Sequence, residues 1–204
     1  SFSNFLGINY FMYLLYFFIP ANIFIYGVND YWDQSTDEIN PKKEDKEFKL
    51  RNKDRRFLRN TLIVVLLISV ILLFFQKGVL QRITFLSFLF LSYFYSAEPL
   101  RFKSKPFLDF SSNMLYIMPG IFGYVLVTDN LPPLIIILAA VGHISAMHIF
   151  SAIPDIKYDK KAGITTTAVY LGYKKSLLLC IFFWSLLAGI TLLMSNFHPL
   201  SFLV

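Results

Sequence analysis

Carboxylates recur in the segment N-D-Y-W-D-Q-S-T-D at residues 29–37. Asp30, Asp33 and Asp37 stand at i, i+3 and i+7, a spacing that brings side chains to one face of a helix. Three carboxylates repel one another there, and the negative end of the helix dipole adds to the repulsion. A divalent cation relieves it, and oxygen ligands completed by water and phosphate are typical of Mg²⁺. The pattern therefore predicts a magnesium site, with a charged membrane-edge flank as the alternative.

A second acidic pair follows in S-A-I-P-D-I-K-Y-D-K-K-A-G. Asp155 and Asp159 are four residues apart and again share one helix face, with Lys157 among the lysines around them. Alone this pair is a common pattern. Together with the first motif it predicts two acidic helix ends that face one another across one cavity and hold Mg²⁺ and a bridging diphosphate.

Cations dominate a third segment, Y-S-A-E-P-L-R-F-K-S-K-P at residues 95–106. The planar fork of Arg101 and the point charge of Lys103 suit phosphate oxygens, so this loop is a candidate for binding a departing diphosphate. For the lysines, ordinary basic flanking of a membrane helix explains the pattern equally well. Asp109 and Asn113 follow at i, i+4 at membrane depth, where a polar side chain needs a partner or a function.

Helices that cross a membrane must position these residues. The chain has 204 residues, 56% of them hydrophobic, and a mean hydropathy of +0.56. A helix needs about 20 apolar residues to cross the hydrocarbon core. The single cysteine excludes an intrachain disulfide. The fold class predicted is an all-α, polytopic transmembrane bundle with about six spans, at residues 5–28, 61–76, 83–96, 107–127, 132–153 and 176–195.

Basic residues collect in alternate loops. Residues 31–60 hold nine Lys and Arg, residues 97–106 hold three and residues 155–175 hold five, so seventeen of the nineteen share one side. The positive-inside rule makes that side cytoplasmic and places the N-terminus outside. The net charge of +6 then reflects topology and contact with membrane lipid, so that nucleic-acid binding is not expected.

In order along the chain, N-D-x-x-D-x-x-x-D, Y-S-x-x-P-L-R-x-K and D-x-x-x-D followed by G-I-x-T-T-A resemble the motifs of the UbiA superfamily of intramembrane prenyltransferases. The segments R-F-K-S-K-P-F-L-D, N-x-L-Y-I-x-P-G-I-F-G-Y and S-A-I-P-D-I-x-x-D-K are most similar to the lycopene elongase branch, which prenylates acyclic carotenoids. Glu98 departs from the family, because many relatives have proline there.

The resemblance implies Mg²⁺-dependent transfer of a prenyl group from an allylic diphosphate to a hydrophobic acceptor such as lycopene. It implies a single transmembrane domain over residues 1–204, with an active site that faces the cytoplasm. Members have about nine spans, so we expect this chain to be a fragment that lacks the first and the last helices. The roles implied are catalysis by Asp30, Asp33, Asp155, Asp159 and Tyr95, diphosphate binding by Asn29, Arg101, Lys103, Lys157 and Asn113, and metal binding by the four catalytic aspartates with Asp37.

Three other functions were weighed. An aromatic acceptor, as in quinone biosynthesis, is the alternative within the same superfamily. A CDP-alcohol phosphotransferase also places aspartates at membrane helix ends, but its D-G-x-x-A-R sequence is absent. A transporter explains the hydrophobicity, yet it does not require two acidic clusters on one face.

Overall fold

The computed structural model describes residues 7–37 and 50–196, with the side chains of residues 35–37 left out, and all regular structure in these ranges is helical. The chain forms two compact units. The first comprises Ser1–Arg101 and Met118–Leu131, and the second Phe102–Ile117 and Pro132–Val204. Each unit carries one of the two acidic motifs.

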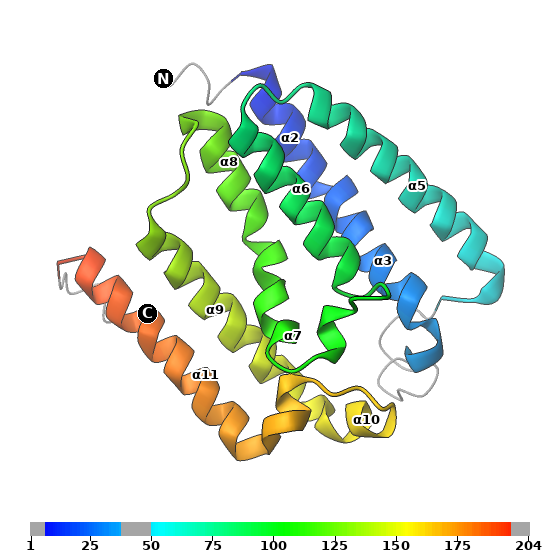
Figure 1. The fold of residues 1–204 in the computed structure, drawn as a ribbon, viewed down its shortest axis with the longest axis vertical. Coiled ribbons are helices and arrows are strands. Elements are labelled where there is room, and N and C mark those ends of the chain that lie inside the picture. Colours follow the sequence, from blue (N-terminus) through cyan, green and yellow to red (C-terminus); the bar gives the residue numbers. More distant parts are fainter. Residues whose placement is uncertain (1–6, 38–49, 197–204) are drawn as a thin grey trace. The chain divides into compact units, whose positions relative to one another are not determined.

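The first unit is built from apolar helices of different lengths (Figure 1). They are α2 (Ile8–Phe18), α3 (Pro20–Asp37), α5 (Asn52–Phe74), α6 (Val79–Phe94) and α8 (Met118–Thr128). The first two follow one another and together form a candidate span, Ile8–Gln34. Pro20 begins α3, where a missing N–H costs little because the first helical amides have no intrahelical partner.

Aromatic side chains form the core of the first unit. Phe85 of α6 lies fully buried between Tyr16 of α2, at a ring-centroid distance of 5.2 Å, and Phe122 of α8, at 5.5 Å. The Tyr13 hydroxyl donates to the Leu72 carbonyl of α5 at 2.7 Å. Rings thus supply buried apolar area, while hydroxyls satisfy polar groups between helices that lack water.

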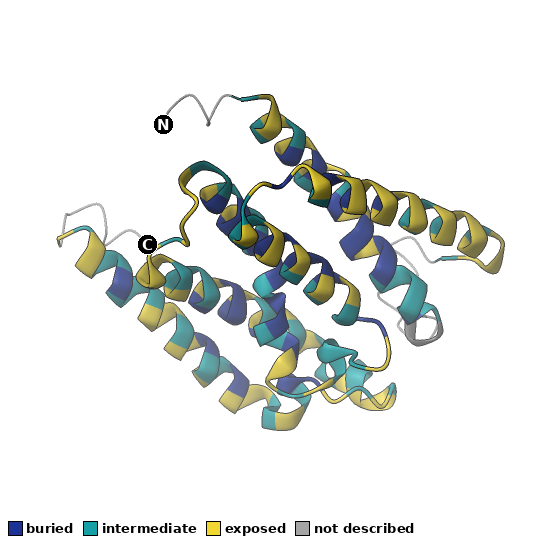
Figure 2. Cartoon of the chain, turned by 45° about the horizontal axis from the view of Figure 1, so that its top comes forward, coloured by how far each residue is buried: buried dark blue, intermediate teal, exposed yellow. Residues whose placement is uncertain are grey.

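The outer face of α5 is almost entirely apolar. The helix has 23 residues, and its most apolar stretch of 18 residues has a mean hydropathy of 2.5. Only 17% of that stretch is buried. Figure 2 shows exposed residues along most of this helix, at the upper right of that view. An exposed apolar face of this size is stable in lipid and not in water.

The second unit packs α9 (Leu134–Ala152) against α11 (Thr167–Met194). Gly172 has a φ of +74° and bends α11, a backbone angle that glycine adopts without strain. Short helices complete the unit, and they are η1 (Phe102–Ser104), α7 (Leu108–Ser111), η2 (Ser112–Tyr116), η3 (Ile153–Asp155) and α10 (Ile156–Lys161).

All six predicted spans coincide with helical segments, and the predicted helical fold class is confirmed. Four helices in the described ranges are long and apolar enough to cross a membrane, or five if Leu108–Tyr116 and Met118–Thr128 form one broken span. The predicted span at 83–96 is the shorter apolar helix α6. The protein is therefore an integral membrane protein with several apolar helices.

Two helices begin about nine residues earlier than predicted. α5 starts at Asn52 and not at residue 61, and α11 starts at Thr167 and not at residue 176. The additional turns of α5 carry charged side chains, which do not continue an apolar pattern but remain helical outside the hydrocarbon core. In α11 the additional residues precede and include the kink at Gly172. Part of the basic loop at residues 31–60 lies outside the described residues.

Candidate active site

The first acidic motif occupies the last turns of α3. Asp33 is only 4% exposed, whereas Asn29 and Asp30 are half-buried. The Asn29 amide donates to the hydroxyl of Ser96 at 3.0 Å. Ser96 follows α6, so this hydrogen bond joins the first acidic motif to the basic segment that the sequence analysis identified 67 residues later.

Arg101 makes the second link between the same segments. Its Nη2 lies 3.4 Å from Oδ1 of Asp33, and its Nη1 lies 3.6 Å from Oε1 of Glu98. The Asp33 side chain is 5% exposed and the Arg101 side chain 22%. A guanidinium between two carboxylates at the mouth of a helical bundle is positioned to exchange one of them for a phosphate oxygen.

Other predicted residues of this region have less defined positions. Tyr95 is half-buried, and its backbone N–H donates to the Leu91 carbonyl at 2.9 Å at the end of α6. Lys103 lies half-buried in η1, in the second unit. The side chain of Asp37 lies outside the described residues. The roles assigned to these residues stay predictions.

The second acidic motif bridges η3 and α10. Asp155 ends η3, Asp159 lies in α10, and both side chains are half-buried. The Thr166 hydroxyl donates to the Asp159 carboxylate at 3.4 Å, and the N–H of Ile164 donates to the Asp159 carbonyl at 2.9 Å. These bonds tie α10 to the start of α11, while Lys157 is exposed.

Whether the two aspartate pairs face one another stays a prediction, because they lie in different compact units. Within the described residues, no three His, Cys, Asp or Glu side chains are grouped closely enough to hold a metal ion. Each pair does match the one or two carboxylates that Mg²⁺ commonly takes from a protein, with water and phosphate completing its six ligands.

Asp109 has a structural partner that the sequence analysis missed. Its carboxylate is 1% exposed and accepts the Thr167 backbone N–H at 2.7 Å, and it also accepts the Thr167 hydroxyl. His148 Nε2 lies 3.9 Å from the same carboxylate. An anion at the first turn of α11 satisfies a donor that no helical carbonyl can reach and complements the helix dipole.

Asn113 is buried beside Asp109. Its amide donates to the Asp109 carbonyl at 3.2 Å. This hydrogen bond gives the amide a partner within its own segment. The contact between Asn113 and diphosphate stays a prediction. The T-T-A sequence at 166–168 does signal a helix start, although sequence alone does not identify which acid meets it.

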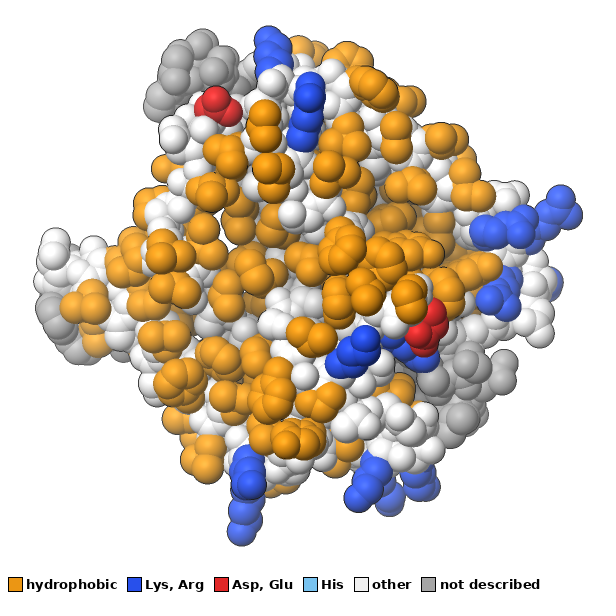
Figure 3. Space-filling model, in the orientation of Figure 1, with side chains coloured by type: hydrophobic (Ala, Val, Ile, Leu, Met, Phe, Trp, Pro, Cys, Tyr) orange, Lys and Arg blue, Asp and Glu red, His pale blue; other side chains and the backbone are white. Residues whose placement is uncertain are grey.

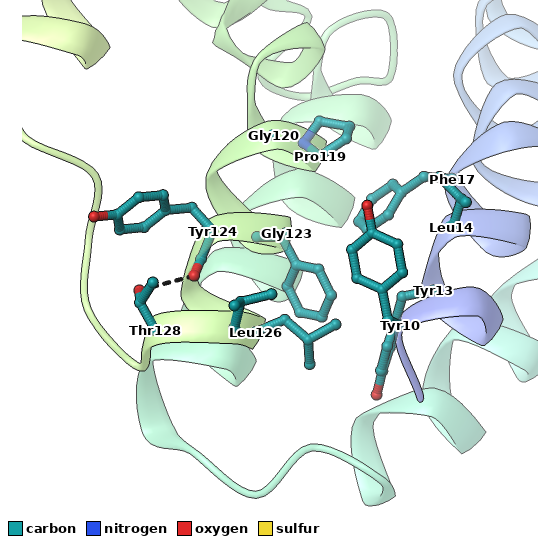
Figure 4. Close-up of a pocket in the computed structure, with 12 residues that line it drawn as sticks. Tyr10, Tyr13, Leu14, Phe17, Pro119, Gly120, Gly123, Tyr124, Leu126 and Thr128 are labelled. Carbon is teal, nitrogen blue, oxygen red and sulfur yellow. Dashed lines mark hydrogen bonds between the residues drawn. The ribbon is translucent and has the colours of Figure 1, made fainter. Parts of the chain in front are cut away.

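An aromatic pocket lies in the first unit, between α2 and α8 (Figure 4). It encloses about 680 Å³. Tyr10, Tyr13 and Phe17 line it from α2, and Gly120 and Gly123 line it from α8. A Cβ at either glycine would meet nothing within 4 Å, so both positions leave space open. The pocket has the composition of a site for an extended apolar ligand.

The sequence matches the UbiA prenyltransferase family over residues 3–204. The chain belongs to this family. The predicted resemblance is therefore confirmed at the level of the family, and the helical fold agrees with it. Prenyl transfer is the chemistry of this family.

Two relatives carry the same name, lycopene elongase/hydratase. The chain is 44% identical over 176 residues to a lycopene elongase/hydratase of Haloarcula japonica, covering 85% of this chain and 58% of that protein. It is 42% identical to a lycopene elongase/hydratase of Haloferax volcanii, with 85% and 56% covered. The chain thus spans less than two-thirds of the length of these relatives.

A solved structure supports the fold. A UbiA homolog from Archaeoglobus fulgidus bound to GPP and Mg²⁺ superposes with a TM-score of 0.74 at 21% identity, covering 91% of this chain and 65% of that one. The same homolog bound to DMAPP and Mg²⁺ gives a TM-score of 0.73 at 20% identity. At such identity the likeness establishes the shared fold alone.

Proposed function

We propose that this protein transfers a prenyl group from an allylic diphosphate to an acyclic carotenoid in a Mg²⁺-dependent reaction. The observation that carries the proposal is the contact between Asp33 and Arg101, supported by the hydrogen bond between Asn29 and Ser96. It joins an acidic motif suited to a metal to a guanidinium suited to a diphosphate. The names of the relatives supply the class of acceptor.

The residues present fit Mg²⁺. Asp30 and Asp33 offer carboxylate oxygens on one helix end of the first unit, and Asp155 and Asp159 offer a second pair in the other unit. The cation, when bound, would neutralise the charge of the diphosphate and of its leaving form. Its presence would also relieve the repulsion between neighbouring carboxylates at a helix C-terminus.

Arg101 supplies charge stabilisation by the protein itself. Its guanidinium is held by Asp33 and Glu98 at the edge of the bundle. In the proposed reaction the allylic C–O bond breaks, and its electron pair passes to the diphosphate oxygen that Arg101 binds. A carbon–carbon double bond of the acceptor then attacks the allylic cation and forms the new bond. The resulting cation loses a proton or takes up water.

The aromatic pocket fits the remote part of a long apolar substrate. Phe17 lines the pocket, and Asp33 lies sixteen residues further along the candidate span Ile8–Gln34. At about 1.5 Å per residue the two are separated by about 24 Å along the axis. An extended polyene of many isoprene units is long enough to span this distance.

The experiment supplies membranes that contain the protein with prenyl diphosphate, Mg²⁺ and either lycopene or a hydroxybenzoate, and follows prenylated products by mass spectrometry. We expect product with lycopene only, and none after chelation of divalent metal. The Asp33→Asn variant should lose the activity, while the matched variant Asp129→Asn, in an exposed loop, should keep it. Product with the aromatic acid alone would reject the acceptor, and turnover that chelator leaves unchanged would reject the mechanism.

A further inference from the structure

A second apolar groove lies in the first unit, along α3, α5 and α6. It encloses about 630 Å³, and its walls include Leu66 and Val70 of α5, Phe90 of α6 and Trp32 of α3. The acidic and aromatic residues discussed above, Asp33 and Phe17 among them, do not belong to this lining. The groove therefore shares no lining residue with the aromatic pocket, and Tyr31 and Trp32 in its lining are the sequence neighbours of Asp30 and Asp33.

One end of the groove is cationic. Arg59 is the charged residue in its lining, and it lies in the second turn of α5. One turn earlier, the guanidinium of Arg55 lies over the Tyr31 ring at 4.6 Å from its centroid. Tyr31 and Trp32 both line the groove at this end. Aromatic rings beside arginines at the start of an apolar helix are typical of the membrane interface.

The first turns of α5 carry more basic than acidic side chains. The first turns of α5 contain Lys53, Arg55, Arg56 and Arg59 and one acid, Asp54. Asp54 is bound by Arg51, whose Nε lies 2.8 Å from its Oδ2. Figure 3 shows Lys and Arg side chains gathered at the right-hand edge, where α5 begins in Figure 1, beside a face covered by hydrophobic side chains. The groove thus pairs an apolar length with a positive end.

We propose that this groove binds one anionic phospholipid, with an acyl chain along α5 and α6 and the phosphate at Arg59. From Arg59 to Leu73, which also lines the groove, the helix advances about 21 Å. That length exceeds half of a hydrocarbon core of about 30 Å, so one leaflet's chain fits beside it. Basic residues at this depth attract anionic headgroups.

A prenyl diphosphate is a poorer match for this groove. Among the described residues that line it, no side chain is acidic. A diphosphate with Mg²⁺ requires carboxylate ligands, which the groove does not offer. A headgroup with a single phosphate needs only the cationic end. The proposal is independent of the prenyltransferase activity, because it rests on other residues.

Trp32 provides a reporter of occupancy. The sequence has two tryptophans, Trp32 and Trp184, so the Trp184→Phe variant leaves Trp32 as the fluorescent residue. This variant is placed in vesicles of unlabelled phosphatidylcholine. One set of vesicles contains brominated phosphatidylglycerol, and the other contains brominated phosphatidylcholine at the same mole fraction. Brominated phosphatidylglycerol should quench Trp32 with an apparent affinity at least threefold higher than brominated phosphatidylcholine.

A matched pair of variants tests the position of the headgroup. Arg59→Gln should lower the ratio of the apparent affinities for brominated phosphatidylglycerol and brominated phosphatidylcholine, the lipid preference, to about one. Arg59→Lys should keep most of this preference because the charge remains. Lys53→Gln removes one charge from the same helix but lies about 120° around the helix from Arg59, so it should leave the preference unchanged. Thermal unfolding of each variant in detergent identifies any loss that reflects misfolding.

Three outcomes would overturn the proposal. Equal quenching by the two brominated lipids would mean that the groove does not select charge. Equal losses from Lys53→Gln and Arg59→Gln would assign the preference to a diffuse basic surface. Relief of the quenching by added prenyl diphosphate would make the groove a substrate site. If Arg59→Gln fails to fold, the lipid comparison and Arg59→Lys still decide the question.

Discussion

Replacing Arg101 by glutamine removes the guanidinium that lies 3.4 Å from the Asp33 carboxylate. At that separation and an effective dielectric constant of about 20, two unit charges attract by about 5 kcal/mol. Desolvation of both groups offsets much of this attraction, and the distance is longer than that of a strong charge-assisted hydrogen bond. We therefore expect a net coupling of about 2 kcal/mol between Asp33 and Arg101.

A double-mutant cycle measures this coupling. Arg101→Gln should destabilise the protein by about 3 kcal/mol, because it removes a cation beside the buried Asp33 carboxylate. In the Arg101→Gln background, Asp33→Asn should cost about 2 kcal/mol less than it does in the unmodified protein. Unfolding in detergent by heat or by denaturant gives the free energies. Glu98→Gln is the matched control, because it removes the second carboxylate beside Arg101. The Glu98 side chain is 55% exposed, so this change should cost less than about 0.5 kcal/mol.

Activity separates the two roles of Arg101. Loss of a group that stabilises developing charge lowers turnover by about 10²-fold to 10³-fold. Arg101→Gln alone should therefore lower turnover by this factor at temperatures at which the variant is still folded. A cycle in which the two stability losses simply add would refute the pairing of the charges. Full turnover by folded Arg101→Gln protein would show that Arg101 acts only on the fold.

Three further variants test other contacts. Gly123→Leu should fill the aromatic pocket and lower kcat/KM for lycopene at least tenfold, with little effect on melting temperature. Gly189→Leu is the control, because a Cβ at Gly189 also meets nothing within 4 Å, and it should leave kcat/KM unchanged. Equal losses of kcat/KM in the two variants would argue against a substrate in the pocket. Asp109→Ala should destabilise the protein by about 2–3 kcal/mol, because the Thr167 donors lose their acceptor, and an unchanged unfolding free energy would contradict this anchoring role. Tyr16→Phe breaks the 2.6 Å bond to Ser69 and should cost about 1 kcal/mol, measured by the same unfolding assay; a neutral effect would mean that water or a backbone group replaces the hydroxyl.

The helical segments of this protein follow from local pattern. Long apolar runs between charge clusters predicted all six helical regions, because a backbone in lipid must satisfy its own hydrogen bonds within each segment. The break in the predicted span at 107–127 agrees with Pro119 and Gly120 in that region. The start of α5 was predicted too late because a charged segment continues the helix beyond the apolar pattern. The start of α11 was predicted too late because the kink at Gly172 and the two lysines after it interrupt the apolar pattern.

The candidate site was predictable in its residue types but not in its contacts. Spacing alone placed Asp30 and Asp33 on one helix face, and the planar guanidinium of Arg101 in a basic loop pointed to phosphate binding. The pairing of Asp33 with Arg101 across 68 residues, and of Asp109 with Thr167 across 58, came only from the tertiary structure. Periodicity reports which side of a helix a residue occupies, whereas a partner distant in sequence depends on how helices pack, and the packing of many side chains determines that arrangement together.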